Sequence, residues 1–388
     1  MTLPSEKTAG PVDRAALATP LHVGRPNVGN RERLYHRFDT VLDRNWLTND
    51  GPMLIELERR LAAFLGVRHC LCVSSGTVGL EILARALGLH GEVIIPSFTF
   101  VATAHALTWL GLRPVFSDID QATHHLDPST VEAAITPATT AICGVHLWGM
   151  PCAVEALQDI AARRNLRLFF DAAHAFGSQH NGRMIGQFGD AEVFSFHATK
   201  IFNTLEGGAI TTNDDALAER IVLMRNFGFA GIDCVDSVGT NGKMNEFSAA
   251  VGLTNLESLE EFVAVNRRNY AAYRLALSGL PGVRLLEFQG TDACNYHYVV
   301  IEVDEAVAGV SRDSVWQRLQ SENVLARRYF WPGVHRMAPY RDSHLAPTVR
   351  LPATEQVAAR VIVLPTGRDV TAASIASIVG IITMSLRA

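Results

Sequence analysis

The sequence predicts an α/β fold, in which a large three-layer domain with a mostly parallel sheet precedes a smaller C-terminal α+β domain. Two observations support this prediction. Between Pro52 and about residue 215, short continuous apolar runs alternate with amphipathic segments, a pattern typical of parallel strands that helices cover on both faces. After about residue 245 the pattern changes to a long helical stretch followed by further strands and helices. We therefore expect a flexible N-terminal arm over residues 1–25, the large domain over 26–250 and the small domain over 251–388.

The expected elements follow from hydrophobic periodicity and from turn residues. In the large domain we expect helices over 53–66, 78–87, 102–110 and 153–164, and strands over 69–73, 92–96, 113–118, 140–146, 166–171 and 191–196. In the small domain we expect helical segments over 247–277, 312–322 and 372–386, and strands over 283–286 and 297–303. Parallel sheets bind ligands beyond the carboxyl ends of their strands, so the residues that follow the expected strands are the first candidates for a site.

Composition excludes several classes of function. The 388 residues are 48% hydrophobic, enough for a large core, and carry a net charge of −5 with no basic stripe, which argues against a nucleic-acid partner. No apolar run approaches the ~20 residues of a membrane span, and the N-terminus lacks a signal-peptide pattern. The six cysteines include only one closely spaced pair, Cys70 and Cys72, which does not complete a zinc site. We expect a cytoplasmic protein with free thiols and without a metal.

The most informative residues are a carboxylate and an amine 29 positions apart, each at the end of an expected strand. Asp171 follows the apolar run Leu168–Phe170, and Lys200 follows the run Val193–Phe196. A partly desolvated lysine is a nucleophile that forms Schiff bases, and an aspartate can hold a pyridinium nitrogen protonated, so the pair indicates a pyridoxal phosphate enzyme. Alternatively, Asp171 caps a helix and Lys200 is an ordinary surface charge.

Neighbouring motifs fit the same chemistry but each has a structural alternative. The strand-to-helix turn around Ser75, Gly76 and Thr77 has free helix amides that can bind phosphate, or it is a plain helix cap. Phe100 follows a strand end and either stacks on a planar ring or packs in the core. His174 either contacts a cofactor ring or begins a helix. Glycines 207 and 208 follow Glu206 and make a tight turn into a strand.

Together these segments resemble the DegT/StrS-type sugar aminotransferases, which are fold-type I pyridoxal phosphate enzymes. The resemblance extends from about Asn45 to the C-terminus. The matching segments are Leu47–Pro52, Ser75–Thr77, Pro96–Phe100, Asp171–His174, Ser195–Lys200, Glu206–Gly208 and Gly239–Glu246. Lys243 and Asn245 depart from the family pattern, in which Arg and Ser are frequent at these positions.

The resemblance implies a role for each matching residue. Lys200 would bind the cofactor as a Schiff base and move the proton at the substrate carbon, and Asp171 would pair with the pyridine nitrogen. His174 would lie beside the 3-oxygen, where many relatives have Gln, and Phe100 would stack on the ring. The phosphate would be held by Ser75, Gly76, Thr77 and Ser195. Asn241 would reach the phosphate in the neighbouring subunit, which implies a homodimer with shared active sites.

The resemblance also implies the reaction. L-glutamate would donate the amino group, and a nucleotide-linked keto sugar would accept it. Ser-Phe-His-x-x-Lys followed by Glu-Gly-Gly, at residues 195–208, is similar to enzymes that aminate carbon 4, whereas carbon 3 enzymes more often show Ser-Phe-Tyr-Pro-x-Lys with Gly-Asp-x-Gly. We therefore expect conversion of dTDP-4-keto-6-deoxyglucose to dTDP-4-amino-4,6-dideoxyglucose, for glycosylated secondary metabolites or surface polysaccharides. The alternatives are a carbon 3 aminotransferase, a sugar dehydratase with histidine in place of the lysine, and a non-enzymatic sensor.

Five residues are candidates for contact with the sugar nucleotide. They are His197, Arg327, Arg328, Tyr329 and His335, the last four in a segment where relatives carry a substrate-facing loop. Arginine binds a diphosphate through paired hydrogen bonds, and an aromatic ring covers a base or a sugar. The alternative is an ordinary surface loop.

Overall fold

In the computed structural model, residues 17–288, 293–342, 344–346 and 349–387 are described. Within them, seven strands form the central sheet in the order β2-β10-β9-β6-β5-β3-β4. Their bounds are β2 His69–Val73, β3 Glu92–Pro96, β4 Arg113–Ser117, β5 Thr139–Val145, β6 Arg167–Asp171, β9 Ala191–Ser195 and β10 Gly208–Thr212. All neighbours pair in parallel except β10, which is antiparallel to both β2 and β9. The predicted α/β fold with a mostly parallel sheet is confirmed.

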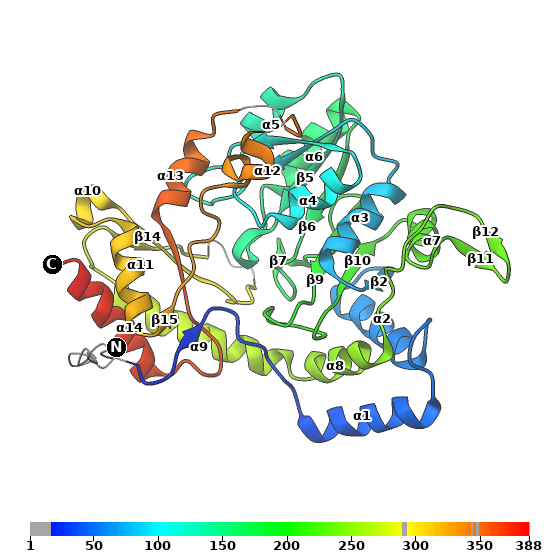
Figure 1. The fold of residues 1–388 in the computed structure, drawn as a ribbon, viewed down its shortest axis with the longest axis horizontal. Helices are drawn as coiled ribbons and strands as arrows, with labels where there is room; N and C mark the ends of the chain where they lie inside the picture. Colours follow the sequence, from blue (N-terminus) through cyan, green and yellow to red (C-terminus); the bar gives the residue numbers. More distant parts are fainter. Residues whose placement is uncertain (1–16, 289–292, 343, 347–348, 388) are drawn as a thin grey trace, which may run out of the picture.

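Helices cover both faces of this sheet and form two separate cores (Figure 1). One layer contains α2 Pro52–Leu65, α6 Val154–Arg164 and α8 Glu246–Leu256, and the other contains α3 Gly76–Ala86, α4 Ala102–Trp109 and α7 Asp215–Met224. Successive strand residues point to opposite faces, so Phe170 packs with the first layer and Phe169 with the second. Continuous apolar strands therefore fill both cores, as the sequence pattern indicated.

The small domain has its own core around a three-stranded antiparallel sheet. The sheet contains β13 Val283–Leu285, β14 Val299–Val303 and β16 Val361–Leu364, and the core also takes side chains from α9 Leu259–Leu277, α11 Arg312–Ser321 and α14 Ala372–Ser385. The helical stretch expected over 247–277 is two helices, because the chain turns between α8 and α9 at Glu257 and Ser258. The predicted domain boundary after residue 250 falls inside α8.

The predicted N-terminal arm lies partly outside the described residues, which begin at residue 17. In the described part, β1 Leu21–His22 pairs in parallel with β15 Val324–Leu325, and Leu21 belongs to the core of the small domain. Helix α1 Arg31–Arg44 then runs along α8 (Figure 1), where the Phe38 and Phe247 rings lie 5.2 Å apart. The beginning of the described chain is therefore anchored to both domains.

The remaining elements are short. They are α5 Pro128–Ala134, α10 Glu305–Ala308, α12 Ala338–Arg341, α13 Pro352–Arg360, the 3-10 turns Leu147–Gly149 and Val334–Arg336, and the hairpins β7 Gln179–His180 with β8 Arg183–Met184 and β11 Phe229–Gly231 with β12 Cys234–Val235. Among the described residues, no helix has both the length and the apolar character needed to cross a membrane.

Candidate active site

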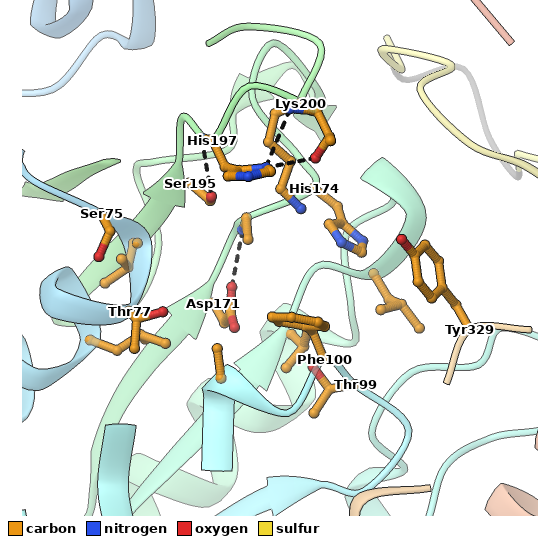
Figure 2. A pocket seen from close by; sticks show the side chains of 18 of the residues that line it. Ser75, Thr77, Thr99, Phe100, Asp171, His174, Ser195, His197, Lys200 and Tyr329 are labelled. Carbon is orange, nitrogen blue, oxygen red and sulfur yellow. Dashed lines mark hydrogen bonds between the residues drawn. The ribbon is translucent and has the colours of Figure 1, made fainter. Parts of the chain in front are cut away.

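A cavity of about 410 Å³ lies beyond the carboxyl ends of β6 and β9 (Figure 2). Of the residues singled out in the sequence, Ser75, Gly76, Thr77, Phe100, Asp171, His174, Ser195, His197, Lys200, Arg327 and Tyr329 line it. In Figure 2 the Lys200 nitrogen points into the cavity, with Asp171 and Phe100 across from it and His174 beside it. The parallel topology thus brings together side chains that are far apart in the sequence.

Asp171 is the last residue of β6, and its side chain is buried. Its Oδ2 accepts a hydrogen bond from the Thr103 hydroxyl at 2.8 Å, and its Oδ1 accepts one from the backbone N–H of Ala173 at 3.1 Å. Burial raises the pKa of Asp171, whereas these two hydrogen bonds and the nearby Lys200 lower it. Each donor therefore stabilises the ionised form of Asp171 in a buried site, where water does not solvate the charge.

Lys200 follows β9 in a short turn, which its backbone N–H closes by donating to the carbonyl of His197 at 2.9 Å. Its side chain is partly buried. Burial lowers the pKa of the Lys200 ammonium to about 8, although the charge of Asp171 acts in the opposite direction. About a tenth of this amine is therefore unprotonated at pH 7, far more than for a free lysine, and this form can act as a nucleophile.

His174 and Phe100 flank the space between Lys200 and Asp171. His174 is buried, and its ring lies 4.4 Å from the ring of Tyr298. Burial lowers the pKa of His174 well below its usual value, and the charge of Lys200 lowers it further. The imidazole is therefore neutral. Phe100 is 56% exposed although it is aromatic, so it presents apolar surface to whatever fills the cavity.

One end of the cavity is formed by the N-terminus of α3. Ser75 caps this helix and accepts a hydrogen bond from the backbone N–H of Val78 at 3.1 Å. A Cβ atom on Gly76 would lie 3.0 Å from Cβ of Ser195, so glycine allows the helix to approach the end of β9. The first turn of α3 therefore lies next to Ser195, and the backbone amides of a helix N-terminus can bind a phosphate.

The structure separates the five candidate substrate residues into two groups. Arg327, Tyr329 and His197 line the cavity, but Arg328 and His335 are not among its lining residues. Arg328 pairs with Asp313 at 2.9 Å and lies over the ring of Trp316. His335 is buried, with its Nδ1 2.7 Å from the hydroxyl of Ser97. The charge of Arg328 and the ring of His335 are thus engaged within the protein.

Asn241 is exposed and does not line the cavity of its own chain. It lies in an isolated antiparallel bridge with Asn226, next to Gly242, whose carbonyl accepts the backbone N–H of Ser74 at 2.8 Å. This segment therefore contacts the chain just before α3 and does not line the cavity.

Six residues that complete the cavity lie outside the segments quoted from the sequence: Leu80, Ala102, Val145, Leu147, Tyr298 and Phe330. Glu206, Gly207, Thr99, Ala173, Val193 and Thr199 also line it and lie within those segments, although the last four were given no role. Tyr298 had no signal in the sequence, because it belongs to the small domain and reaches the cavity only when that domain packs against the large one. Among the described residues, no group of three or more His, Cys, Asp or Glu side chains is placed to hold a metal ion.

Comparisons with known proteins agree with this geometry. A model of the DegT/DnrJ/EryC1/StrS aminotransferase family matches residues 29–383. The chain belongs to this family. A dTDP-4-amino-4,6-dideoxy-D-glucose transaminase from Shigella dysenteriae is 37% identical to this aminotransferase over 346 residues, which cover 89% of this chain and 94% of the relative. A GDP-perosamine synthase from Caulobacter vibrioides is 34% identical, covering 92% of this chain and 95% of the relative.

Solved structures show the same relationship. The structure of DesI in the presence of its TDP-sugar product superposes with a TM-score of 0.92 at 50% identity, and the match covers 96% of this chain and 94% of that one. The protein is a sugar aminotransferase, and its cofactor is pyridoxal phosphate. The residues around the cavity fit that group, since an amine, a buried carboxylate, an exposed aromatic ring and a helix N-terminus converge on one space.

Proposed function

We propose that the enzyme transfers the amino group of L-glutamate to carbon 4 of dTDP-4-keto-6-deoxyglucose and forms dTDP-4-amino-4,6-dideoxyglucose. The observation that carries this proposal is the convergence of Lys200, Asp171 and neutral His174 on one cavity, and the motif at residues 195–208 supports carbon 4 as the site of amination. The names of the Shigella relative and of the DesI structure support a dTDP-linked sugar as substrate.

Four side chains would hold the cofactor ring. When bound, pyridoxal phosphate supplies an aldehyde that bonds to amines and a ring that accepts electrons. Lys200 would bond to this aldehyde at rest. Once a substrate amine has displaced it, its Nζ would remove a proton from the donor carbon in the first half-reaction and deliver a proton to carbon 4 of the sugar in the second. Asp171 would hold the proton on the ring nitrogen, His174 would donate a hydrogen bond to the 3-oxygen, and Phe100 would cover one ring face.

The remaining contacts would hold the charged groups at the two ends of the cavity. Ser75, Gly76, Thr77 and Ser195 form the cradle for the cofactor phosphate. Arg327 is exposed and lines the cavity, and it has the geometry to bind the sugar diphosphate through paired hydrogen bonds. Tyr329 and His197 then face the sugar.

A second copy of the chain would complete the site. Asn241 is exposed and lies outside the cavity of its own chain, so it is available to the phosphate in a partner subunit. Exposed apolar side chains lie on α1, on the segment after it and on the β11–β12 hairpin, where a partner would cover them. They include Tyr35, Leu42, Trp46, Leu47, Phe229 and Val235. The six free thiols favour a reducing compartment such as the cytoplasm.

Incubation with L-glutamate and dTDP-4-keto-6-deoxyglucose tests the reaction directly. We expect 2-oxoglutarate and a product in which NMR places nitrogen on carbon 4, whereas nitrogen on carbon 3 would contradict the regiochemistry. Lys200→Ala and Lys200→Arg should both lose turnover and the cofactor band that borohydride fixes. Lys200→Arg is the matched control because it keeps the positive charge but removes the amine that forms a Schiff base. Turnover by either variant would contradict the role of Lys200.

A further inference from the structure

A chain of two buried hydroxyl groups ends on the carboxylate of Asp171. Thr103 Oγ1 lies 2.8 Å from Asp171 Oδ2, and Thr99 Oγ1 lies 3.0 Å from Thr103 Oγ1. Both threonines are almost completely buried, with 1% of Thr103 and 2% of Thr99 exposed. Thr103 belongs to the first turn of α4, and Thr99 lines the cavity.

Hydrogen-bond chemistry fixes the direction of this chain. An ionised carboxylate accepts hydrogen bonds but donates none, so Thr103 must donate its single hydroxyl proton to Asp171. The Thr103 oxygen then acts as the acceptor toward Thr99, which must donate. Each donation polarises the next, so the two hydroxyls together stabilise negative charge on Asp171.

We propose that Thr103 is a positioning residue for the reaction, whose hydroxyl holds Asp171 ionised and fixes the direction in which its carboxylate faces the cofactor ring nitrogen. Thr99 supports it through the second hydrogen bond. This inference rests on the proposed role of Asp171. With the Thr103 hydroxyl in place, the proton between Asp171 and the ring nitrogen stays on the ring, because the carboxylate is the weaker base. Without the hydroxyl, a buried carboxylate with one donor fewer takes that proton more readily.

Among the described residues, the titratable groups near Asp171 make no hydrogen bond to its side-chain oxygens, which accept from the Thr103 hydroxyl and the Ala173 N–H. The backbone N–H of His146 donates to the Asp171 carbonyl at 3.0 Å, while the His146 ring faces Glu192. Cys143 lies on the adjacent strand β5, and Lys200 and His174 face Asp171 from the cavity side. A substitution at Thr103 leaves all of these groups in the protein, so its effect reports on the hydroxyl.

The pH titration of the visible cofactor band in the holoenzyme tests this inference. A ring nitrogen that has lost its proton withdraws less charge from the bond to Lys200, so that bond holds its own proton to higher pH. We expect the titration midpoint of Thr103→Val to move upward and its cofactor dissociation constant to rise about tenfold, the effect of losing a hydrogen bond to a charged group. Thr103→Ser, which restores the hydroxyl, should titrate like the native enzyme. Thr99→Val should move the midpoint in the same direction by less.

Thr108→Val is the matched control on the same helix, because the Thr108 hydroxyl donates to the carbonyl of Ala104 rather than to Asp171. It should leave the midpoint unchanged. A native midpoint in Thr103→Val would overturn the inference. If that variant does not fold, Thr103→Ala carries the same test and the same two outcomes. Asp171→Asn distinguishes a failure of this inference from a failure of the proposed role of Asp171. If Asp171→Asn shifts the midpoint and Thr103→Val does not, only the inference about Thr103 is wrong. A native midpoint in Asp171→Asn would contradict the proposed role of Asp171 as well.

Discussion

The backbone N–H of Trp148 donates a hydrogen bond to Nδ1 of His174 across 3.4 Å. Since this nitrogen accepts, the single proton of the neutral imidazole resides on Nε2. Burial and the charge of Lys200, which lower the pKa of His174, keep the ring in this form. His174 therefore offers the cavity a neutral N–H donor whose tautomer is set by the main chain of a neighbouring loop.

A neutral donor at position 174 predicts the effect of substitutions there. His174→Gln should retain most of the cofactor affinity, because the glutamine amide also donates a hydrogen bond. His174→Phe keeps a flat ring but removes the donor, and should weaken cofactor binding about tenfold. Titration of the apoenzyme with pyridoxal phosphate, followed by the visible band, measures both. Equal affinities for the two variants would show that no hydrogen bond is made there.

The lowered pKa of Lys200 predicts the pH dependence of cofactor capture by the apoenzyme. Only the neutral amine attacks an aldehyde, so the rate should rise about tenfold per pH unit below the Lys200 pKa of about 8 and become level above it. Asp171→Asn removes the charge that raises this pKa, and the plateau should therefore begin at lower pH. Stopped-flow absorbance gives the profile, and a rate that still rises beyond pH 10 would contradict the lowered pKa.

Two adjacent arginines provide a matched test of substrate binding. Arg327 lines the cavity, whereas Arg328 pairs with Asp313 outside it. Arg327→Ala should raise the KM for the sugar nucleotide about tenfold or more, because a charge-assisted contact to the diphosphate is lost. Arg328→Ala should change this KM less than about twofold. Steady-state kinetics at saturating glutamate distinguish the two, and equal effects would place the diphosphate elsewhere.

Arg225 is the centre of a buried ion-pair network that links three segments of the large domain. It is 4% exposed and its guanidinium donates to the Glu58 carboxylate, to the carbonyl of Cys72 at 3.0 Å and to Asp50 at 3.0 Å. Arg225→Ala leaves Glu58 without its cation and should cost about 3–5 kcal/mol of unfolding free energy.

Arg59→Ala is the control for this change, because it breaks the exposed pair between Arg59 and Glu56. It should cost less than about 1 kcal/mol. Urea denaturation at one protein concentration measures both variants. A loss below about 1 kcal/mol for Arg225→Ala would mean that water replaces the guanidinium.

Substitution by alanine should change the stability of the protein in opposite directions at two helical glycines. A Cβ on Gly252 in α8 would lie 2.8 Å from Cδ2 of Leu57 and 2.9 Å from Cγ2 of Thr204, whereas a Cβ on Gly380 in α14 meets no atom within 4 Å. Gly380→Ala should stabilise the protein by about 0.5–1 kcal/mol through reduced chain entropy. Gly252→Ala should destabilise it by about 1–3 kcal/mol, because overpacking exceeds that gain. Thermal melts of both variants test the sign, and a higher melting temperature for Gly252→Ala would show that α2 and α8 can separate freely.

Much of the large domain was predictable because its signals are local. Apolar runs such as Leu168–Phe170 and Val193–Phe196 have the length and continuity of buried parallel strands. Asp171 and Ser195, the last residues of those strands, line the cavity. The break between α8 and α9 was not predictable, since the apolar periodicity continues across Glu257, whose carboxylate is held by three arginines from α1 and α2.

The sequence alone indicated the class of chemistry, because a carboxylate and an amine that follow two strands of a parallel sheet can lie at the same edge of that sheet. The tertiary structure decided which of the candidate substrate-binding residues line the cavity. Arg327 and Arg328 are adjacent and chemically identical, yet only Arg327 lines the cavity, since Asp313 and Trp316 of α11 hold Arg328. The environment of Asp171 was likewise settled by contact with Thr103, 68 residues away. Hydrogen bonds and desolvation depend on neighbours in space, and residue spacing along the chain does not specify those neighbours.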